Sequence, residues 1–161
     1  MKAIGIDPGL AMTGFGIVEA LFRGGRACHW GTIRTGSGHP LSSRLKTIYD
    51  NVKGLLEEWR PDLMAMEEVF VLKTFPRAAI QLGEVRGVIS LAAQEMGVPV
   101  IGIKPTEVKS ALTGSGRADK KQMEKVIRQL LKIDGPIGSS HAGDALALAL
   151  TGLSRSRHFR W

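Results

Sequence analysis

The order of its short apolar segments constrains the fold of this chain more than any other feature of the sequence. Segments 3–6, 14–21 and 27–34 come first, and each is short and apolar enough to form a strand. The dipeptide Gly24-Gly25 predicts a hairpin between the second and the third. Segments with helical spacing then alternate with short apolar runs. A hairpin followed by helical crossovers predicts an α/β domain built on a mixed sheet.

The remaining segments continue this alternation. We expect two more strands, over residues 63–69 and 98–103, and helices over residues 41–59, 77–96, 106–112, 119–133 and 142–153. From a length of 161 residues we expect one domain over residues 1–153 and a basic tail over residues 154–161. Gly114 and Gly116 predict that the segment 113–118 is mobile.

Charge and composition indicate the kind of partner. The chain has 22 Lys and Arg residues against 15 Asp and Glu, a net charge of +7, which favours nucleic acid as a partner. A basic protein without an anionic partner is the alternative. The single cysteine, Cys28, excludes an intramolecular disulfide. Because no apolar run approaches about 18 residues and the start of the chain lacks a leader, we expect a cytoplasmic protein with no membrane partner.

Acidic residues occur where the surrounding sequence is apolar. Asp7 follows the first strand, Glu67 and Glu68 lie in the strand that begins at Leu63, and Asp144 lies in a helix that is apolar on every side. We expect that helix to be buried, and a carboxylate inside it then needs a cation, a raised pKa or a metal ion. A turn, a surface position or a salt bridge explains each acid on its own. Taken together, two strand ends and a buried helix predict one cleft.

His141 lies three residues before Asp144, so both side chains project from the same helix face. A helix-capping or solvent-exposed histidine is the alternative interpretation. Beside the acids, His141 is a candidate metal ligand or general acid and base. A set of mostly oxygen ligands without a thiolate suits Mg²⁺ or Mn²⁺. Because pairs of such cations hydrolyse phosphodiesters, the sequence predicts a metal-dependent nuclease.

Motifs along residues 2–153 share their order and spacing with one known family. They are Gly5-Ile6-Asp7-Pro8-Gly9 with Thr13-Gly14 and Gly16, Glu67-Glu68-Val69-Phe70, Leu82-Gly83 with Arg86-Gly87, Val108-Lys109, Ala118-Asp119-Lys120-Lys121-Gln122 and His141-Ala142-Gly143-Asp144-Ala145-Leu146-Ala147. In these motifs the chain resembles the RuvC family of Holliday-junction resolvases. The Asp7-Pro8-Gly9 motif by itself is shared with other RNase H-like nucleases and with actin-like ATPases.

The resemblance implies an RNase H-like fold, in which a five-stranded mixed β-sheet is flanked by helices on both faces. It implies a homodimer that resolves four-way DNA junctions in homologous recombination and DNA repair. Symmetric paired nicks made by metal-activated water would leave 5′-phosphate and 3′-hydroxyl ends. The resemblance further implies two Mg²⁺ ions per subunit, or Mn²⁺, and cooperation with the RuvA–RuvB branch-migration complex.

The resemblance also assigns roles to single residues. Asp7, Glu67 and Asp144 match the family's metal-binding acids, with Glu67 rather than Glu68 because adjacent strand residues face opposite sides. His141 stands where many members carry Asp and others His, and an imidazole there favours Mn²⁺ over Mg²⁺. Whether His141 is a metal ligand or a proton shuttle stays open. Lys120 resembles the family's catalytic-loop lysine.

DNA contacts follow partly from the resemblance and partly from an aromatic residue among cations. The expected DNA-binding residues are Phe70, Lys73, Arg77, Lys109, Arg117, Lys120 and Lys121. Phe70 would act as a wedge at an unpaired base near the junction centre. A core position for Phe70 and solvated surface positions for the lysines are the alternatives.

Three other functions fit parts of the sequence. An RNase H-like nuclease acting on structured or precursor RNA would use the same acids. A non-catalytic junction-binding protein would keep the basic surface but tolerate the loss of Asp7. An actin-like ATPase would cradle a phosphate with the turn after Asp7, but 161 residues do not provide the second domain that such an enzyme needs.

Overall fold

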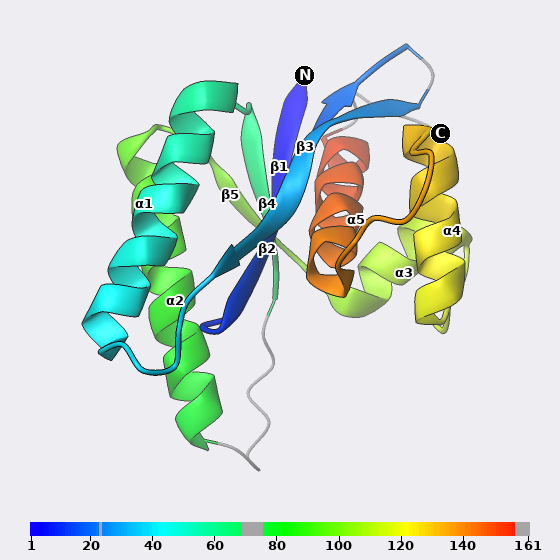
Figure 1. The fold of residues 1–161 in the computed structure, drawn as a ribbon. Helices are drawn as coiled ribbons and strands as arrows, with labels where there is room; N and C mark the ends of the chain where they lie inside the picture. The colour runs from blue at the N-terminus through cyan, green and yellow to red at the C-terminus, as the bar shows by residue number, and fades with distance from the viewer. Residues whose placement is uncertain (23, 69–75, 157–161) are drawn as a thin grey trace.

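The computed structural model describes residues 1–22, 24–68 and 76–156 (Figure 1). Within these residues the chain forms five strands, β1 Lys2–Asp7, β2 Met12–Ala20, β3 Gly25–Arg34, β4 Leu63–Glu67 and β5 Val100–Ile103. It also forms five helices, α1 Leu41–Trp59, α2 Pro76–Glu95, α3 Pro105–Thr113, α4 Lys120–Leu131 and α5 Ser140–Arg155. Each predicted helix and strand is present, with ends shifted by a few residues. None of the described helices is long and apolar enough to span a membrane.

The strands form one mixed sheet in the order β3-β2-β1-β4-β5. The first three strands are antiparallel neighbours, and β4 and β5 run parallel to β1 and to each other. The mixed sheet predicted from the sequence is therefore confirmed. Ile6 pairs with Met66, so the residues that follow them, Asp7 and Glu67, end their strands side by side at the carboxyl edge of the parallel pair.

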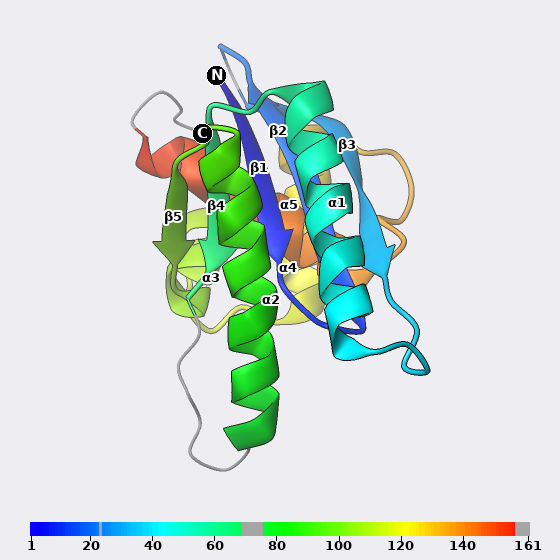
Figure 2. The same cartoon turned by 90° about the vertical axis from the view of Figure 1, so that its left-hand side faces the viewer.

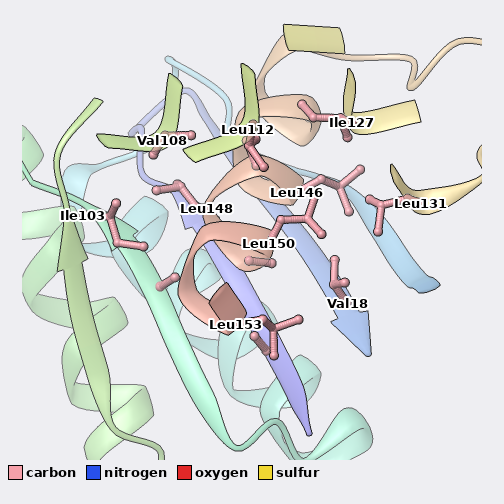
Figure 3. Packing of buried hydrophobic residues seen from close by; sticks show 14 of the residues in the cluster. Val18, Ile103, Val108, Leu112, Ile127, Leu131, Leu146, Leu148, Leu150 and Leu153 are labelled. Atoms are coloured by element: carbon pink, nitrogen blue, oxygen red, sulfur yellow. The ribbon is translucent and has the colours of Figure 1, made fainter. Parts of the chain in front are cut away.

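Helices cover both faces of the sheet. In Figures 1 and 2, α1 and α2 lie on one face, α5 lies against the other, and α3 and α4 lie outside α5. Strand β1 divides its side chains between the two: Ile4 and Ile6 belong to the core under α1 and α2, whereas Ala3 faces the core around α5. Figure 3 shows this second core, where Leu146 and Leu150 of α5 pack near side chains of α3, α4 and the sheet.

Glycines let α5 lie directly on the sheet. A Cβ atom on Gly5 of β1 would overlap the backbone carbonyl oxygen of Ala145, and one on Gly14 of β2 would overlap that of His141. The backbone of α5 thus contacts the backbones of β1 and β2 without side chains between them. This close approach fixes the start of α5 relative to the end of β1, where Asp7 lies.

Several element ends differ from the predicted ones, three of them for clear local reasons. Strand β5 begins two residues late because the backbone N–H of Val98 bonds back to Ala93 at the end of α2. Asp119 is the N-cap of α4 rather than its first residue, since it forms a capping box with Gln122. Helix α4 ends at Leu131 because Lys132 adopts a left-handed conformation. Helix α5 continues to Arg155, and residues 157–161 of the predicted basic tail lie outside the described residues.

Candidate active site

Asp7 lies at the carboxyl end of β1, where the chain turns back into β2. The turn is held by Thr13, a fully buried residue whose hydroxyl donates to the carbonyl oxygen of Gly9 at 2.8 Å. The carbonyl oxygen of Met12 lies where a side chain on Gly9 would be, so the turn also requires a glycine there. The Asp-Pro-Gly sequence therefore serves a structural purpose while it presents Asp7 at the edge of the sheet.

His141 contacts Asp7 directly. Its Nδ1 atom lies 2.6 Å from Oδ2 of Asp7, a hydrogen-bond distance that joins the first turn of α5 to the end of β1. The Asp7 side chain is 15% exposed and the His141 side chain 43% exposed. Burial raises the pKa of Asp7, and the hydrogen bond with His141 and the charge of Lys120 oppose that rise. The contact engages one carboxylate oxygen, and a carboxylate has two that can accept or ligate.

Glu67 and Glu68 diverge at the end of β4. Glu67 lines a cleft together with Asp144. Its pKa is raised first by burial and then by the negative charges of Asp7 and Asp144. The side chain of Glu68 instead lies over β5 at Gly102. The two neighbours face apart, as the alternation of side chains along a strand requires.

Arg86 of α2 holds the end of β4 in place. Its Nη1 atom donates to the backbone carbonyl oxygen of Glu67, and its charge opposes the rise in the pKa of that carboxyl group. Loss of hydration lowers the pKa of Arg86 itself. Arg86 was not among the predicted site residues. The contact joins α2 to β4, so the local sequence around Arg86 carries no signal for it.

Asp144 lies on α5 but outside its buried surface. Ala142 and the residues from Ala145 to Leu153 are buried as predicted, whereas Asp144 itself is exposed toward the cleft. The expectation of a carboxylate buried within an apolar helix was wrong, because this side of the first turns of α5 faces open space rather than another element. Partial loss of hydration still raises the pKa of Asp144, as does the negative charge of Asp7.

Two lysines line the same cleft from α3 and α4. Lys109 and Lys120 both oppose the rise in the pKa of Asp144, and Lys120 also opposes the rise in the pKa of Asp7. The cleft has a volume of about 570 Å³, and much of its remaining wall is apolar. Acids beside lysines suit a phosphate group, because the lysines neutralise its charge while a cation joins it to the acids.

The acids fit a hard divalent cation by their chemistry. Asp7, Glu67 and Asp144 supply carboxylate oxygens and His141 supplies an imidazole nitrogen, which are ligand types found in Mg²⁺ and Mn²⁺ sites. A cation among the three carboxylates would relieve the repulsion that contributes to the raised pKa of Glu67 and of Asp144. In the described part of the chain, no three such side chains surround one point closely enough to hold an ion unaided. Water and substrate phosphate oxygens ordinarily complete the shell of Mg²⁺.

The other predicted DNA-binding residues lie away from the walls of the cleft or outside the described residues. Arg117 and Lys121 are exposed near the start of α4, and Arg77 is exposed in the first turn of α2. None of these three belongs to the described residues that line the cleft. Phe70 and Lys73 lie outside the residues that the structure describes.

The fold and the site together define the class of protein. The sheet order β3-β2-β1-β4-β5, with carboxylates at the ends of two parallel strands and on the helix packed across them, is that of an RNase H-like nuclease. The family model described as crossover junction endodeoxyribonuclease RuvC matches residues 3–152. This chain belongs to the RuvC family, and the predicted family and fold are confirmed.

Relatives and solved structures agree with this assignment. The crossover junction endodeoxyribonuclease RuvC of Brevibacillus brevis is 41% identical over 151 residues, which cover 94% of this chain and 90% of the relative. The structure of RuvC from Thermus thermophilus in complex with a Holliday junction substrate matches with a TM-score of 0.92 at 34% identity, covering 98% of this chain and 96% of that one. Nucleases of this family depend on a metal ion.

Proposed function

We propose that this chain resolves Holliday junctions by a metal-dependent cut in two strands of a four-way DNA junction. The observation that carries this proposal is the convergence of three acids from separate elements. Glu67 and Asp144 line a cleft that Lys109 and Lys120 also line, and Asp7 lies close enough to both acids for its charge to raise their pKa values. Membership of the RuvC family and the match to a RuvC–junction complex support it. A junction binder without activity would have no use for this crowding of carboxylates.

Lys109 and Lys120 bind the scissile phosphate in this proposal. Both are close enough to Asp144 to affect its pKa. A phosphate bound between these lysines and the acids would have part of its negative charge neutralised by the lysines. Positive charge aimed at the phosphate stabilises the transition state of its hydrolysis, which is the role we assign to Lys120. Lys109, on the separate helix α3, orients the same group.

Asp7, Glu67, His141 and Asp144 are the residues that would hold the metal, which we take to be two Mg²⁺ or Mn²⁺ ions per subunit. When bound, these ions supply Lewis-acid polarisation of the phosphate and a water molecule of lowered pKa. His141 orients the carboxylate of Asp7 through the 2.6 Å contact between them. Because a nitrogen donor suits Mn²⁺ better than Mg²⁺, we expect His141→Asp to shift the ratio of the two metal-supported rates toward Mg²⁺.

We further propose a homodimer that cuts both strands symmetrically and leaves 5′-phosphate and 3′-hydroxyl ends. The exposed side of α2 is our candidate for the dimer interface, because Ile80 is 65% and Leu91 53% exposed there. Gly83 and Gly87, both exposed, lie between them on the same helix. We expect Leu91→Glu to give a monomer in sedimentation experiments. Cooperation with a RuvA–RuvB branch-migration complex completes this proposal.

A cleavage assay tests the proposal. A labelled mobile four-way junction is compared with a linear duplex and with a structured RNA of related sequence, in Mg²⁺, in Mn²⁺ and in EDTA. We expect paired nicks confined to the junction, sealed by ligase and lost in EDTA. The Asp7→Asn variant should bind the junction and fail to cut it. Cutting by Asp7→Asn at the wild-type rate would contradict the assigned site, and cutting of the RNA alone would favour the RNA-processing alternative.

A further inference from the structure

Helix α4 has two faces of opposite character. One face buries Met123, Ile127 and Leu131 in the core around α5. Cations follow one another along the other side at intervals of four, three and four residues, the spacing that places side chains in a row on a helix. They are Lys121, Lys125, Arg128 and Lys132, and we call this row the basic row of α4. Its three lysines are exposed, and Arg128 is partly exposed.

The basic row lines an open hollow of about 610 Å³ that also contains the acids Glu124 and Asp134. Four cations therefore face two acids. Within residues 1–22, 24–68 and 76–156, no ion pair joins a cation of the row to an acid. Arg128 donates from Nε to the backbone carbonyl oxygen of Ile133 at 3.5 Å. The row thus keeps an excess of positive charge that the described residues do not neutralise through ion pairs.

The basic row continues the positive side of the candidate active site. Lys121 follows Lys120, which lines the catalytic cleft. From Lys121 to Leu131 the helix rises by about 15 Å, at 1.5 Å per residue, and Lys132 follows directly after its last turn. A duplex rises 3.4 Å per base pair, so the row is as long as about five base pairs. Next to a strand whose phosphate lies at Lys120, the first cation of the row, Lys121, is the adjacent residue of the chain.

We propose that the basic row of α4 binds the phosphate backbone of a duplex arm that leaves the junction centre. The inference rests on the proposed function, because it takes the scissile phosphate to lie beside Lys120. Charges spaced along a helix and few exposed apolar side chains between them suit a polyanion better than a folded acidic protein. Contacts of this kind position the DNA and read no bases, so the row contributes affinity that does not depend on sequence.

The test uses two double variants of the full-length chain that remove the same charge. Lys125→Gln with Lys132→Gln alters the row and leaves Arg128 and its backbone contact intact. Lys46→Gln with Arg60→Gln is the matched control, because Lys46 is also an exposed residue inside a helix and Arg60 also follows a helix in a left-handed conformation. The control residues lie in or directly after α1, on the other face of the sheet.

Binding to a labelled four-way junction is measured over a range of salt concentrations. Each lost phosphate contact lowers the slope of log K against log salt by about one. We expect the row variant to lower the slope by about two per subunit and to weaken binding by about 10-fold at low salt, while the control changes neither. Thermal unfolding of both variants shows whether either change has disturbed the fold.

The outcomes separate this inference from the proposed function. Equal affinity and slope in the row variant, the wild type and the control would overturn the inference, even if the wild type cuts the junction. Equal losses in both variants would overturn it as well, because net charge alone would then explain them. A wild type that neither binds nor cuts a junction would instead contradict the proposed function.

Discussion

The two helical layers on either side of the sheet differ in whether their lysines form ion pairs. On the α1–α2 face, lysines are paired: Lys46 lies 2.6 Å from Asp50, and Lys53 lies 2.8 Å from Glu95. On the α3–α5 face, Lys109 and Lys120 line a cleft beside carboxylates, and no described residue forms an ion pair with either lysine. A pair between Arg155 and Glu107 also lies on this face.

The difference shows how one sheet serves two purposes. Paired surface charges are screened and contribute little beyond solubility, so Lys46 and Lys53 of the α1–α2 layer attract DNA only weakly. Charges that lack a pair keep their field available to a ligand. This arrangement costs free energy of folding, because the ionised form of Glu67 is disfavoured: burial and repulsion by neighbouring acids raise its pKa. The α3–α5 layer therefore gives up stability that a bound cation and a DNA phosphate would restore.

The sharpest contrast lies between neighbours at the end of β4. We expect Glu67→Gln to reduce junction cleavage at least about 1,000-fold, because several kcal/mol of metal-derived stabilisation would be lost. Glu68→Gln should change the rate less than about 10-fold, since that side chain lies over Gly102. Single-turnover cleavage at saturating protein measures both. Equal losses in the two variants would break the assignment of Glu67 to the cleft.

The contact between α5 and the sheet can be tested by adding one methyl group. We expect Gly5→Ala to destabilise the fold by about 3 kcal/mol, because its Cβ atom would overlap the backbone of α5 at Ala145. Gly54→Ala on α1 is the control, since nothing lies within 4 Å of a Cβ atom there, and it should stabilise by about 1 kcal/mol. Urea unfolding of both variants measures the two free energies. Similar effects would mean that α5 can shift away from β1.

Lysines on the two faces should differ in whether their loss affects cleavage or stability. We expect Lys120→Gln to lower the cleavage rate about 100-fold, because it removes positive charge beside the scissile phosphate. Lys46→Gln should leave cleavage unchanged and lower the free energy of unfolding by about 0.5 kcal/mol, since it breaks an exposed pair with Asp50. Cleavage kinetics and urea unfolding are recorded on the same preparations. A large loss of cleavage in Lys46→Gln would remove the distinction between the faces.

The smallest expected effect concerns the stability cost of Asp144. Its pKa is raised in the folded protein, so the fold holds that proton more tightly than the unfolded chain does. Stability therefore falls as the pH rises from the ordinary pKa through the raised one. In EDTA at pH 7, Asp144→Asn should raise Tm by about 2 °C relative to the wild type. The difference should vanish below about pH 3, where the Asp144 carboxyl group is protonated in the folded and in the unfolded chain. A lower Tm of the variant at pH 7 would contradict the cause assigned here.

Much of the fold and part of the site could be predicted from local sequence. Helix α1 was predicted with both of its ends, because its apolar residues keep helical spacing up to Pro61. The choice of Glu67 over Glu68 needed the two-residue period of a strand. The exposure of Asp144 could not be predicted in this way. It depends on whether another element packs against that side of α5, and none of the described elements does. The contact of Arg86 with the Glu67 backbone joins α2 to β4 and has no local signature either.

The element order, the family and a set of candidate acids could be predicted from patterns along the chain, because apolar period and motif spacing are properties of neighbours in sequence. Which of those residues meet depends on how the helices pack on the sheet. The hydrogen bond between Asp7 and His141 joins residues 134 positions apart, and it forms because Gly5 and Gly14 let α5 lie on β1 and β2. Tertiary packing also explains why lysines are paired on one face of the sheet and line a cleft on the other. Which charged side chains come within reach of each other depends on how the helices pack against each face.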